Sequence, residues 1–407
     1  MNVLMDEKCA VFTVCNLAYL PKALVLAESL LKHGHEKIKI YLIDRKCDVA
    51  LPDSLAEFVW IEDAGVPDLY ELAFKYDITE FSTSVKPFIT LQLLENYDKI
   101  IFLDPDTCVY DSINCIFDEL NKHPIVLTPH YMTPQKNELA DSDIGMMRFG
   151  SFNLGFFAVN RTEEALAFLR WWSDRCFRFC YFETQFGLST DQKWVSIAPC
   201  FFKNLFVSFN VGYNMAFWNV HERILGKSSD EKYVINGEYP LIFFHFSSFD
   251  EANPALLSRR PFSEKDKKRQ DWLGLCTSYN AALKLHAIEA SKNKYGFDYM
   301  SNGNYISPTL RRAYACVSRE LLPGHDPFDS NGPVNNFAKK NHLFEKQKSA
   351  YIADSYGDMN KHKAKLAVIN FLMRIILQIL GPNRFANFSR LLVYLSSYRQ
   401  NRDLWKV

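Results

Sequence analysis

The sequence lacks the paired motifs with which proteins usually bind structural zinc. Its ten cysteines are scattered along 407 residues, and none of them forms a Cys-x-x-Cys pair or accompanies a His-x-x-x-His pair. Scattered cysteines of this kind are typical of reduced side chains in the core of a cytosolic protein. We therefore expect no zinc site and a cytoplasmic location.

The sequence also lacks a signal peptide and a net charge. The first fifteen residues, MNVLMDEKCAVFTVC, have no basic head before an apolar run. The 47 basic residues balance 47 acidic ones, yet residues 361–407 hold nine Lys or Arg against the single acid Asp403. This stretch therefore carries +8, which leaves −8 for residues 1–360. A net-acidic body argues against nucleic acid as the main partner, because a phosphate backbone is normally bound by a basic face.

Apolar and aromatic residues are abundant, at 48% and 15%, which excludes disorder over most of the chain. In the first 250 residues, short apolar segments alternate with amphipathic ones. The alternation predicts an α/β fold, a Rossmann-like, mainly parallel sheet with helices on both faces. The predicted strands are residues 10–15, 39–44, 100–103, 124–129, 152–160 and 241–246, and the predicted helices are 24–32, 87–95 and a segment through Trp171 and Trp172.

The character of the sequence changes after Pro254, where charged and helical segments replace the strands. We predict a catalytic domain over residues 1–255 and a helical accessory region over residues 256–345. Gly, Pro and Asp cluster in GHDPFDSNGP, which indicates a loop or linker near residues 322–346. Residues 347–407 are predicted to form basic amphipathic helices.

Two aspartates follow the predicted strand at residues 100–103. Asp104 and Asp106 flank Pro105 just past the carboxyl end of this strand, the edge at which open α/β sheets bind ligands. Two carboxylates on a stiff turn suit a shared hard divalent cation, although they are also common in ordinary turns. Lys86 lies about one βαβ repeat upstream, and a lysine beside a cation is what a departing diphosphate requires. The alternative for Lys86 is a solvated residue before a helix.

The order of the motifs resembles a known family. The chain is similar to nucleotide-sugar glycosyltransferases of the GT-A fold, in particular to the glycogenin-like, family 8 enzymes. Five segments over about 240 residues carry the resemblance: FTVCNLAYLPKALVLAESLL (12–31), SVKPFITLQLLENYDKIIFLDPDTCVY (84–110), FNLGFFAVN (152–160), STDQKW (189–194) and FFHFSSFD (243–250).

The resemblance implies roles on the donor side of the site. Asn16 and Tyr19 would contact the base and ribose of a nucleotide-sugar, with uridine as the expected base, and Lys86 would contact its phosphates. Asp104, Asp106 and His245 would hold Mn²⁺ or Mg²⁺, and an imidazole ligand favours Mn²⁺. A histidine in an aromatic run is otherwise more often a core residue, so the ligand role of His245 depends on the resemblance. The sequence departs from the family after this histidine, because SSFDEANP lacks the usual Gly and Lys-Pro-Trp.

On the acceptor side, the resemblance assigns Asn153, Asp191 and Gln192 to the catalytic part of the site. A carboxylate near the anomeric carbon stabilises positive charge in the transition state, and Asp191 is the candidate. Asp191 could alternatively cap a helix. Trp218 is a candidate for stacking on a sugar, and His221 and Glu222 are candidates for acceptor contacts.

Together these features predict a metal-dependent hexosyltransferase that acts on a glycan or lipid-linked acceptor, in surface polysaccharide synthesis. The resemblance implies that the anomeric configuration is retained. Two other classes stay open. A sugar nucleotidyltransferase is disfavoured because the loop after the first strand, NLAYLPK, has no glycine. A non-catalytic glycan-binding protein with a transferase-like domain is disfavoured because the candidate polar residues are all present.

The basic tail contains two apolar segments. Residues 366–380, LAVINFLMRIILQIL, are too short to span a bilayer and carry a polar stripe at Asn370, Arg374 and Gln378. Gly381-Pro382 breaks this segment, and a second amphipathic one follows. Apolar faces beside basic residues suit the headgroup region of an anionic membrane. The alternative is that both segments pack as core against residues 256–345.

Overall fold

The computed structural model describes residues 8–134, 142–260, 269–321, 324–345, 362–396 and 402–407. The chain forms two compact units. The first comprises residues 1–69 and 78–296, and the second comprises residues 70–77 and 297–407. The first unit thus continues past the predicted boundary at residue 255, and it includes helix α10 (Leu273–Leu285), which packs against α1 (Leu20–Lys32).

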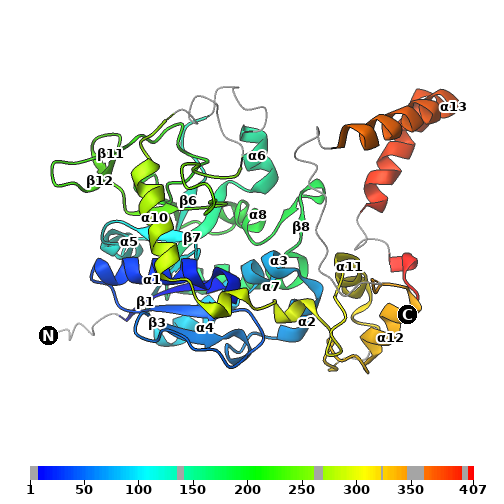
Figure 1. Ribbon diagram of the computed structural model, residues 1–407, viewed down its shortest axis with the longest axis horizontal. Helices are drawn as coiled ribbons and strands as arrows, with labels where there is room; N and C mark the ends of the chain where they lie inside the picture. The colour runs from blue at the N-terminus through cyan, green and yellow to red at the C-terminus, as the bar shows by residue number, and fades with distance from the viewer. Residues whose placement is uncertain (1–7, 135–141, 261–268, 322–323, 346–361, 397–401) are drawn as a thin grey trace. The chain divides into compact units, whose positions relative to one another are not determined.

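The first unit is built on a seven-stranded sheet, which confirms the predicted fold class (Figure 1). All neighbouring strands run parallel except β7, which is antiparallel to both of its neighbours. The strand order is β10 (Leu205–Val207), β6 (Ile125–Pro129), β7 (Phe152–Asn160), β4 (Lys99–Leu103), β1 (Cys9–Cys15), β2 (Ile38–Leu42) and β3 (Ala56–Trp60).

Helices cover both faces of this sheet. On one face, Val11, Ile101 and Phe156 pack in a core that includes residues of α1 and of α5 (Asn114–Leu120). On the other face, Phe12, Phe102 and Phe157 form an aromatic row across three strands, with ring centroids 5.0 and 5.2 Å apart. Trp172 of α7 (Glu163–Phe179) contacts Phe157 edge-on at 5.1 Å, and α7 packs against α4 (Lys86–Asn96). Successive strand residues point to opposite faces, so these alternating apolar runs are buried on both sides.

Local sequence explains where the two helices of the second face begin. The Thr162 side chain accepts a hydrogen bond from Ala165 N, and Glu163 and Glu164 follow in the first turn of α7. Pro87 lies in the first turn of α4, where a missing amide hydrogen costs no helical hydrogen bond. The helix therefore starts at Lys86, close to the carboxyl end of β4.

Short strands and helices complete the first unit. Outside the main sheet, the strands form a pair of β5 (Thr107–Val109) with β14 (Phe243–His245), a pair of β8 (Phe182–Glu183) with β9 (Leu188–Ser189), and a sheet of β11 (Leu225–Lys227), β12 (Tyr233–Ile235) and β13 (Tyr239–Pro240). The remaining α-helices described are α3 (Ile78–Ser84), α6 (Ser142–Phe149) and α8 (Gln192–Val195). The predicted strand 241–246 is thus a three-residue strand that pairs with β5 and lies outside the main sheet.

The second unit is helical and contains α11 (Pro308–Val317), α12 (Pro333–Lys340) and α13 (Lys363–Leu395), together with most of α2 (Leu69–Lys75). Buried Arg311 connects its two chain segments: the guanidinium donates to the carbonyl oxygens of Ala73, Phe74 and Tyr76 and lies 2.8 Å from the Asp298 carboxylate. The last residues pack back on this unit, because Asn341 is hydrogen-bonded to Lys406.

We predict that Arg311→Ala destabilises the second unit by about 3 to 5 kcal/mol, the usual cost of removing one partner from a buried ionic network. Hydrogen–deuterium exchange should then accelerate in residues 70–77 and 308–317, while β4 in the first unit keeps its protection. Arg319→Ala is the control, because Arg319 is exposed. Equal exchange in the Arg311 variant and the control would contradict the prediction.

Candidate active site

Three potential metal ligands converge at the carboxyl end of β4. Asp104 N donates to Gly155 O at 2.8 Å, and Thr107 N donates to Asp104 O at 3.0 Å, which closes a turn that presents Asp104 and Asp106. His245 enters from the neighbouring pair, since it lies opposite Thr107 in the β5–β14 register. One ligand atom from each of Asp104, Asp106 and His245 lies within 4.8 Å of the others.

His245 lies within ion-pair distance of both carboxylates. His245 Nε2 lies 3.1 Å from Asp106 Oδ1 and 3.7 Å from Asp104 Oδ2. Burial alone would raise the pKa of Asp106, but the charge and hydrogen bond of His245 outweigh it and lower that pKa to about 2. Burial would likewise lower the pKa of His245, and the two carboxylates reverse this effect and raise it. The charge of His245 therefore keeps the buried Asp106 carboxylate ionised, as a cation ligand requires.

A buried amide network fixes the orientation of His245. Its Nδ1 lies 3.2 Å from Asn214 Oδ1, and Asn214 Nδ2 donates to Asn153 Oδ1 at 3.0 Å and to Thr128 Oγ1 at 3.2 Å. Because the amide oxygen of Asn214 accepts a hydrogen bond from Nδ1–H, Nε2 is the ring nitrogen that faces the carboxylates. Such outer partners are what orients a histidine ligand in known metal sites.

Lys86 and Asp191 form a second charged pair beside the cluster. Lys86 Nζ lies 3.3 Å from Asp104 Oδ1 and 3.4 Å from Asp191 Oδ2, and it donates to Leu154 O at 2.9 Å. Its side chain is only 5% exposed, so Lys86 is not the solvated residue of the alternative interpretation. Burial would lower the pKa of Lys86, but the two carboxylates outweigh it and raise that pKa. A contact between Lys86 and a donor phosphate stays a prediction.

Asp191 stands at the start of α8, yet its side chain makes no capping hydrogen bond. Thr190 Oγ1 donates to Asp191 Oδ1 at 3.1 Å, and the buried Asp191 Oδ2 faces Lys86 Nζ at 3.4 Å. Burial raises the pKa of Asp191, while the charge of Lys86 opposes this shift. The Asp191 side chain therefore does not cap α8, and its role in catalysis stays a prediction.

The other acceptor-side candidates take part in fixed contacts. Leu154 N donates to Gln192 Oε1 at 3.2 Å, and Gln192 Nε2 donates to Phe149 O at 3.0 Å. Asn153 belongs to the amide network around His245 and also lies 3.4 Å from His130 Nε2. Both residues therefore border the site, and their contacts with a substrate stay predictions.

Three further candidates have structural contacts. The Glu222 carboxylate accepts hydrogen bonds from Met132 N and Thr133 N, at 2.9 and 2.7 Å, and His221 lies 3.4 Å from Thr133 O. Trp218 packs edge-on against His245, with ring centroids 5.2 Å apart. These side chains support the backbone and the metal-ligand cluster.

The predicted nucleotide contacts follow β1. Asn16 Oδ1 accepts a hydrogen bond from Tyr19 N at 3.2 Å, and Tyr19 is 44% exposed. Lys22 Nζ lies 4.1 Å from the centre of the Tyr19 ring, and its charge helps to lower the pKa of Asp106. A cavity of about 290 Å³ lies beside this segment and is lined in part by Leu17 and Asp44.

The sequence interpretation missed three residues of the site: Asn214, Gly155 and Lys22. Asn214 adopts a positive φ of 53°, a conformation that asparagine tolerates better than most residues, but no local pattern indicates its contact with His245. Gly155 leaves the space that the His245 ring occupies. A glycine inside a strand does indicate a close approach by another group, and this signal could have identified Gly155.

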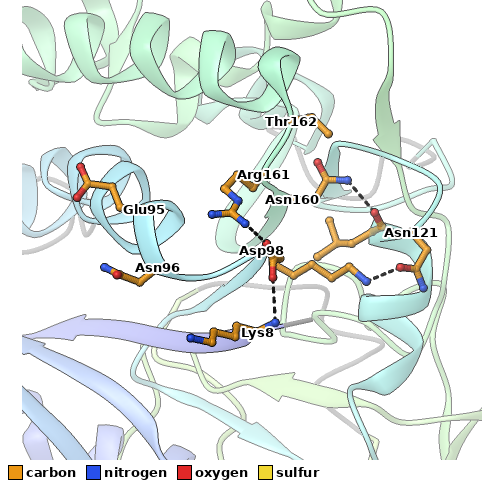
Figure 2. A pocket seen from close by; sticks show the side chains of 10 residues that line it. Lys8, Glu95, Asn96, Asp98, Asn121, Asn160, Arg161 and Thr162 are labelled. Atoms are coloured by element: carbon orange, nitrogen blue, oxygen red, sulfur yellow. Dashed lines mark hydrogen bonds and ion pairs between the residues drawn. The ribbon is translucent and has the colours of Figure 1, made fainter. Parts of the chain in front are cut away.

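A larger cavity, of about 670 Å³, lies at the opposite edge of the sheet (Figure 2). Its lining residues include Lys8, before β1, and Asn160, at the end of antiparallel β7. The Asp98 carboxylate pairs with Arg161 and accepts a hydrogen bond from Lys8 N in this cavity. It contains none of the predicted site residues, so size alone does not identify the candidate active site.

We predict that Gly155→Ala weakens Mn²⁺ binding. The new Cβ would lie 2.4 Å from His245 Cε1, so the ring would have to move away from Asp104 and Asp106. The apparent affinity should fall by about ten- to a hundredfold, the usual cost of disturbing a ligand's support. Free Mn²⁺ measured by electron paramagnetic resonance during a titration tests this. Gly226→Ala is the control, because its Cβ would lie 3.8 Å from the nearest atom. Equal affinity in the two variants would count against His245 as a ligand.

No protein-family model matches the chain. Two curated proteins of Bacillus subtilis (strain 168) are similar to parts of it. Uncharacterized protein YfnD is 26% identical over 246 residues, which cover 58% of this chain and 76% of that protein. Uncharacterized protein YfnF is 23% identical over 184 residues, which cover 44% of this chain and 60% of that protein.

Several solved structures are also similar. The galactosyltransferase LgtC, in complex with donor and acceptor sugar analogs, is 15% identical, with a TM-score of 0.38, and the match covers 67% of this chain and 95% of LgtC. The glycosyltransferase GlyE of Streptococcus pneumoniae TIGR4 is 16% identical, with a TM-score of 0.39 and coverage of 68% and 63%. Mouse xyloside xylosyltransferase 1 is 14% identical, with a TM-score of 0.36 and coverage of 59% and 97%. All three are glycosyltransferases, the class that the ordered motifs resemble, and at these TM-scores they assign no donor or acceptor to this chain.

Proposed function

We propose that this protein is a metal-dependent glycosyltransferase that moves a hexose from a nucleotide diphosphate, with uridine as the base, to a glycan or lipid-linked acceptor. One observation carries the proposal: the Asp104, Asp106 and His245 cluster lies directly beside the buried Lys86–Asp191 pair. The first group suits a divalent cation and the second provides a carboxylate for developing positive charge. A reaction that separates a diphosphate from a sugar carbon uses both.

The ligand atoms of the Asp104, Asp106 and His245 cluster fit Mn²⁺. Two carboxylates provide hard oxygen ligands, and a neutral imidazole is a ligand that Mn²⁺ accepts more readily than Mg²⁺. Asp104, Asp106 and His245 would hold the ion, and Asn214 would keep the imidazole in place. When bound, the cation neutralises negative charge on the leaving diphosphate.

The side chains themselves prepare the site for charge separation. Lys86 lies between Asp104 and Asp191, and its positive charge opposes the rise in the pKa of Asp191 that burial causes. As the bond between the anomeric carbon and the diphosphate oxygen breaks, positive charge grows on the sugar, and the Asp191 carboxylate stabilises it. The acceptor hydroxyl oxygen forms the new bond, and its proton goes to the departing diphosphate.

The finer parts of the proposal rest on the resemblance. Retention of the anomeric configuration, a uridine-linked donor and a role in surface polysaccharide synthesis follow from it as proposals. We also propose a cytoplasmic location, where nucleotide-sugars would be supplied. A screen of nucleotide-sugars, with release of nucleotide diphosphate measured with and without EDTA, is the direct test. Pyrophosphate-dependent formation of a nucleotide-sugar would instead indicate a nucleotidyltransferase, and no turnover with any donor would indicate a glycan-binding protein.

Asp106→Asn should lower the rate of nucleotide diphosphate release by at least about a hundredfold. The change removes a negative charge from the metal-ligand cluster but keeps the size of the side chain, so the loss reflects transition-state electrostatics. Asp111→Asn is a matched control, because Asp111 follows β5 on the same segment and lies outside the cluster. A rate for Asp106→Asn within a few fold of the control would refute the metal-dependent proposal.

Asp191→Asn should lower turnover by about a hundredfold or more while Mn²⁺ affinity stays unchanged, because Asp191 contacts Lys86 and is not part of the ligand cluster. Single-turnover release of nucleotide diphosphate, combined with the Mn²⁺ titration, separates the two effects. If metal affinity and turnover fall in parallel, Asp191 acts on the metal site and the assigned role is wrong.

A further inference from the structure

We infer that α13 is a docking element for the surface of an anionic lipid bilayer, with both of its arms lying in the headgroup region. The inference concerns where the protein is bound and does not depend on the proposed reaction. Among the described residues of α13, none has a buried side chain. The large apolar side chains that are exposed on it are Val368, Ile369, Phe371, Leu372, Leu377, Ile379, Leu391, Leu392, Val393, Tyr394 and Leu395.

These exposures contradict the interpretation of the tail as ordinary core. Phe371 is 63% exposed and Ile379 is 76% exposed, and an 18-residue window of α13 has a mean hydropathy of 1.7. A continuous apolar surface of this kind is unfavourable in water and marks an interaction site. The helix therefore needs an apolar environment that the described residues of the chain do not supply.

The charges on α13 indicate what provides this environment. Residues 363–395 contain five basic residues and no acidic one: Lys363, Lys365, Arg374, Arg384 and Arg390. A second copy of the chain would bring five more positive charges against them, which opposes self-association. An anionic bilayer instead offers apolar chains beneath a negatively charged surface, and it satisfies both properties at once.

The backbone favours a position on the bilayer over a position across it. By length and composition alone α13 is sufficient to cross a membrane, but Gly381 has φ 70° and ψ 166° and Pro382 follows it, so the helix is broken there (Figure 1). Residues 363–380 form an arm of about 27 Å and residues 383–395 a shorter one of about 20 Å, against a hydrocarbon core of about 30 Å. Arg374 lies within the first arm, where a spanning helix would place it in hydrocarbon.

Co-sedimentation of the purified full chain with vesicles tests the inference. Binding is expected to vesicles of phosphatidylcholine with one quarter phosphatidylglycerol, and to be at least about tenfold weaker to phosphatidylcholine alone. Bound protein should be released by 0.5 M NaCl, because salt screens surface charges and does not extract a spanning helix. Equal binding to both vesicles, or resistance to salt, would overturn the surface position.

Matched variants separate local charge from net charge. The triple variant R374Q/R384Q/R390Q should bind anionic vesicles about a hundredfold more weakly, since each basic residue near the surface contributes about fivefold. The control R170Q/K122Q/K203Q removes the same net charge from exposed positions of the first unit and should bind as the unchanged chain does. Equal loss in both triple variants would overturn the assignment to α13.

Two further measurements test whether the apolar side chains of α13 enter the bilayer. F371S/L372S should also weaken binding by about tenfold or more, and unchanged binding would show that the apolar face does not enter the bilayer. Light scattering in the absence of lipid should show no dimer that depends on Phe371 and Leu372, and such a dimer without vesicle binding would assign the face to a second copy. Release of nucleotide diphosphate without vesicles should be equal in all these variants, so failure of docking and failure of the proposed reaction are distinguishable.

Discussion

The candidate site depends on one buried ammonium group. Lys86 Nζ lies 3.3 Å from Asp104 and 3.4 Å from Asp191, and it donates a hydrogen bond to the backbone carbonyl oxygen of Leu154. Burial raises the pKa of Asp191, and the positive charge of Lys86 opposes this shift. The three charged residues come from the start of α4, the end of β4 and the start of α8. The ammonium group thus joins three elements through its contacts with two carboxylates and a backbone carbonyl.

On the other side of Asp104, the opposite charges of His245 and Asp106 likewise stabilise each other. Asp104, Asp106 and His245 would hold a cation here, and the imidazole would have to be neutral at Nε2 to act as a ligand. The contact between Nδ1 and Asn214 orients the ring toward the two carboxylates. The network of buried amides therefore fixes the histidine of the candidate metal site.

The sequence predicts a structural feature when that feature follows from a local pattern of residues. It does not predict a feature that depends on contacts between residues far apart in the sequence. The buried strand at 100–103, the aspartates after it and the bend at Gly381 follow from local patterns, and the structure contains all of them. The fold class is likewise confirmed. Asn214 could not be found, because its role comes from a side-chain contact with His245 across 31 residues of sequence. The pairing of β14 with β5 was missed for the same reason, since three-residue strands carry too little pattern to reveal a partner.

The chain has no net charge, but its excess basic and excess acidic residues lie in different parts of the sequence. This separation of charge matters for the proposed docking. Residues 1–360 carry −8, so an anionic surface repels the body of the protein as a whole. Charges act over about 10 Å at an ionic strength of 0.1 M, and only groups near the bilayer contribute to binding. In the proposed docking, the five basic residues of α13 would act because they lie beside the apolar side chains that bring them to the surface. Repulsion between the net-acidic residues 1–360 and an anionic surface would then favour an encounter through α13.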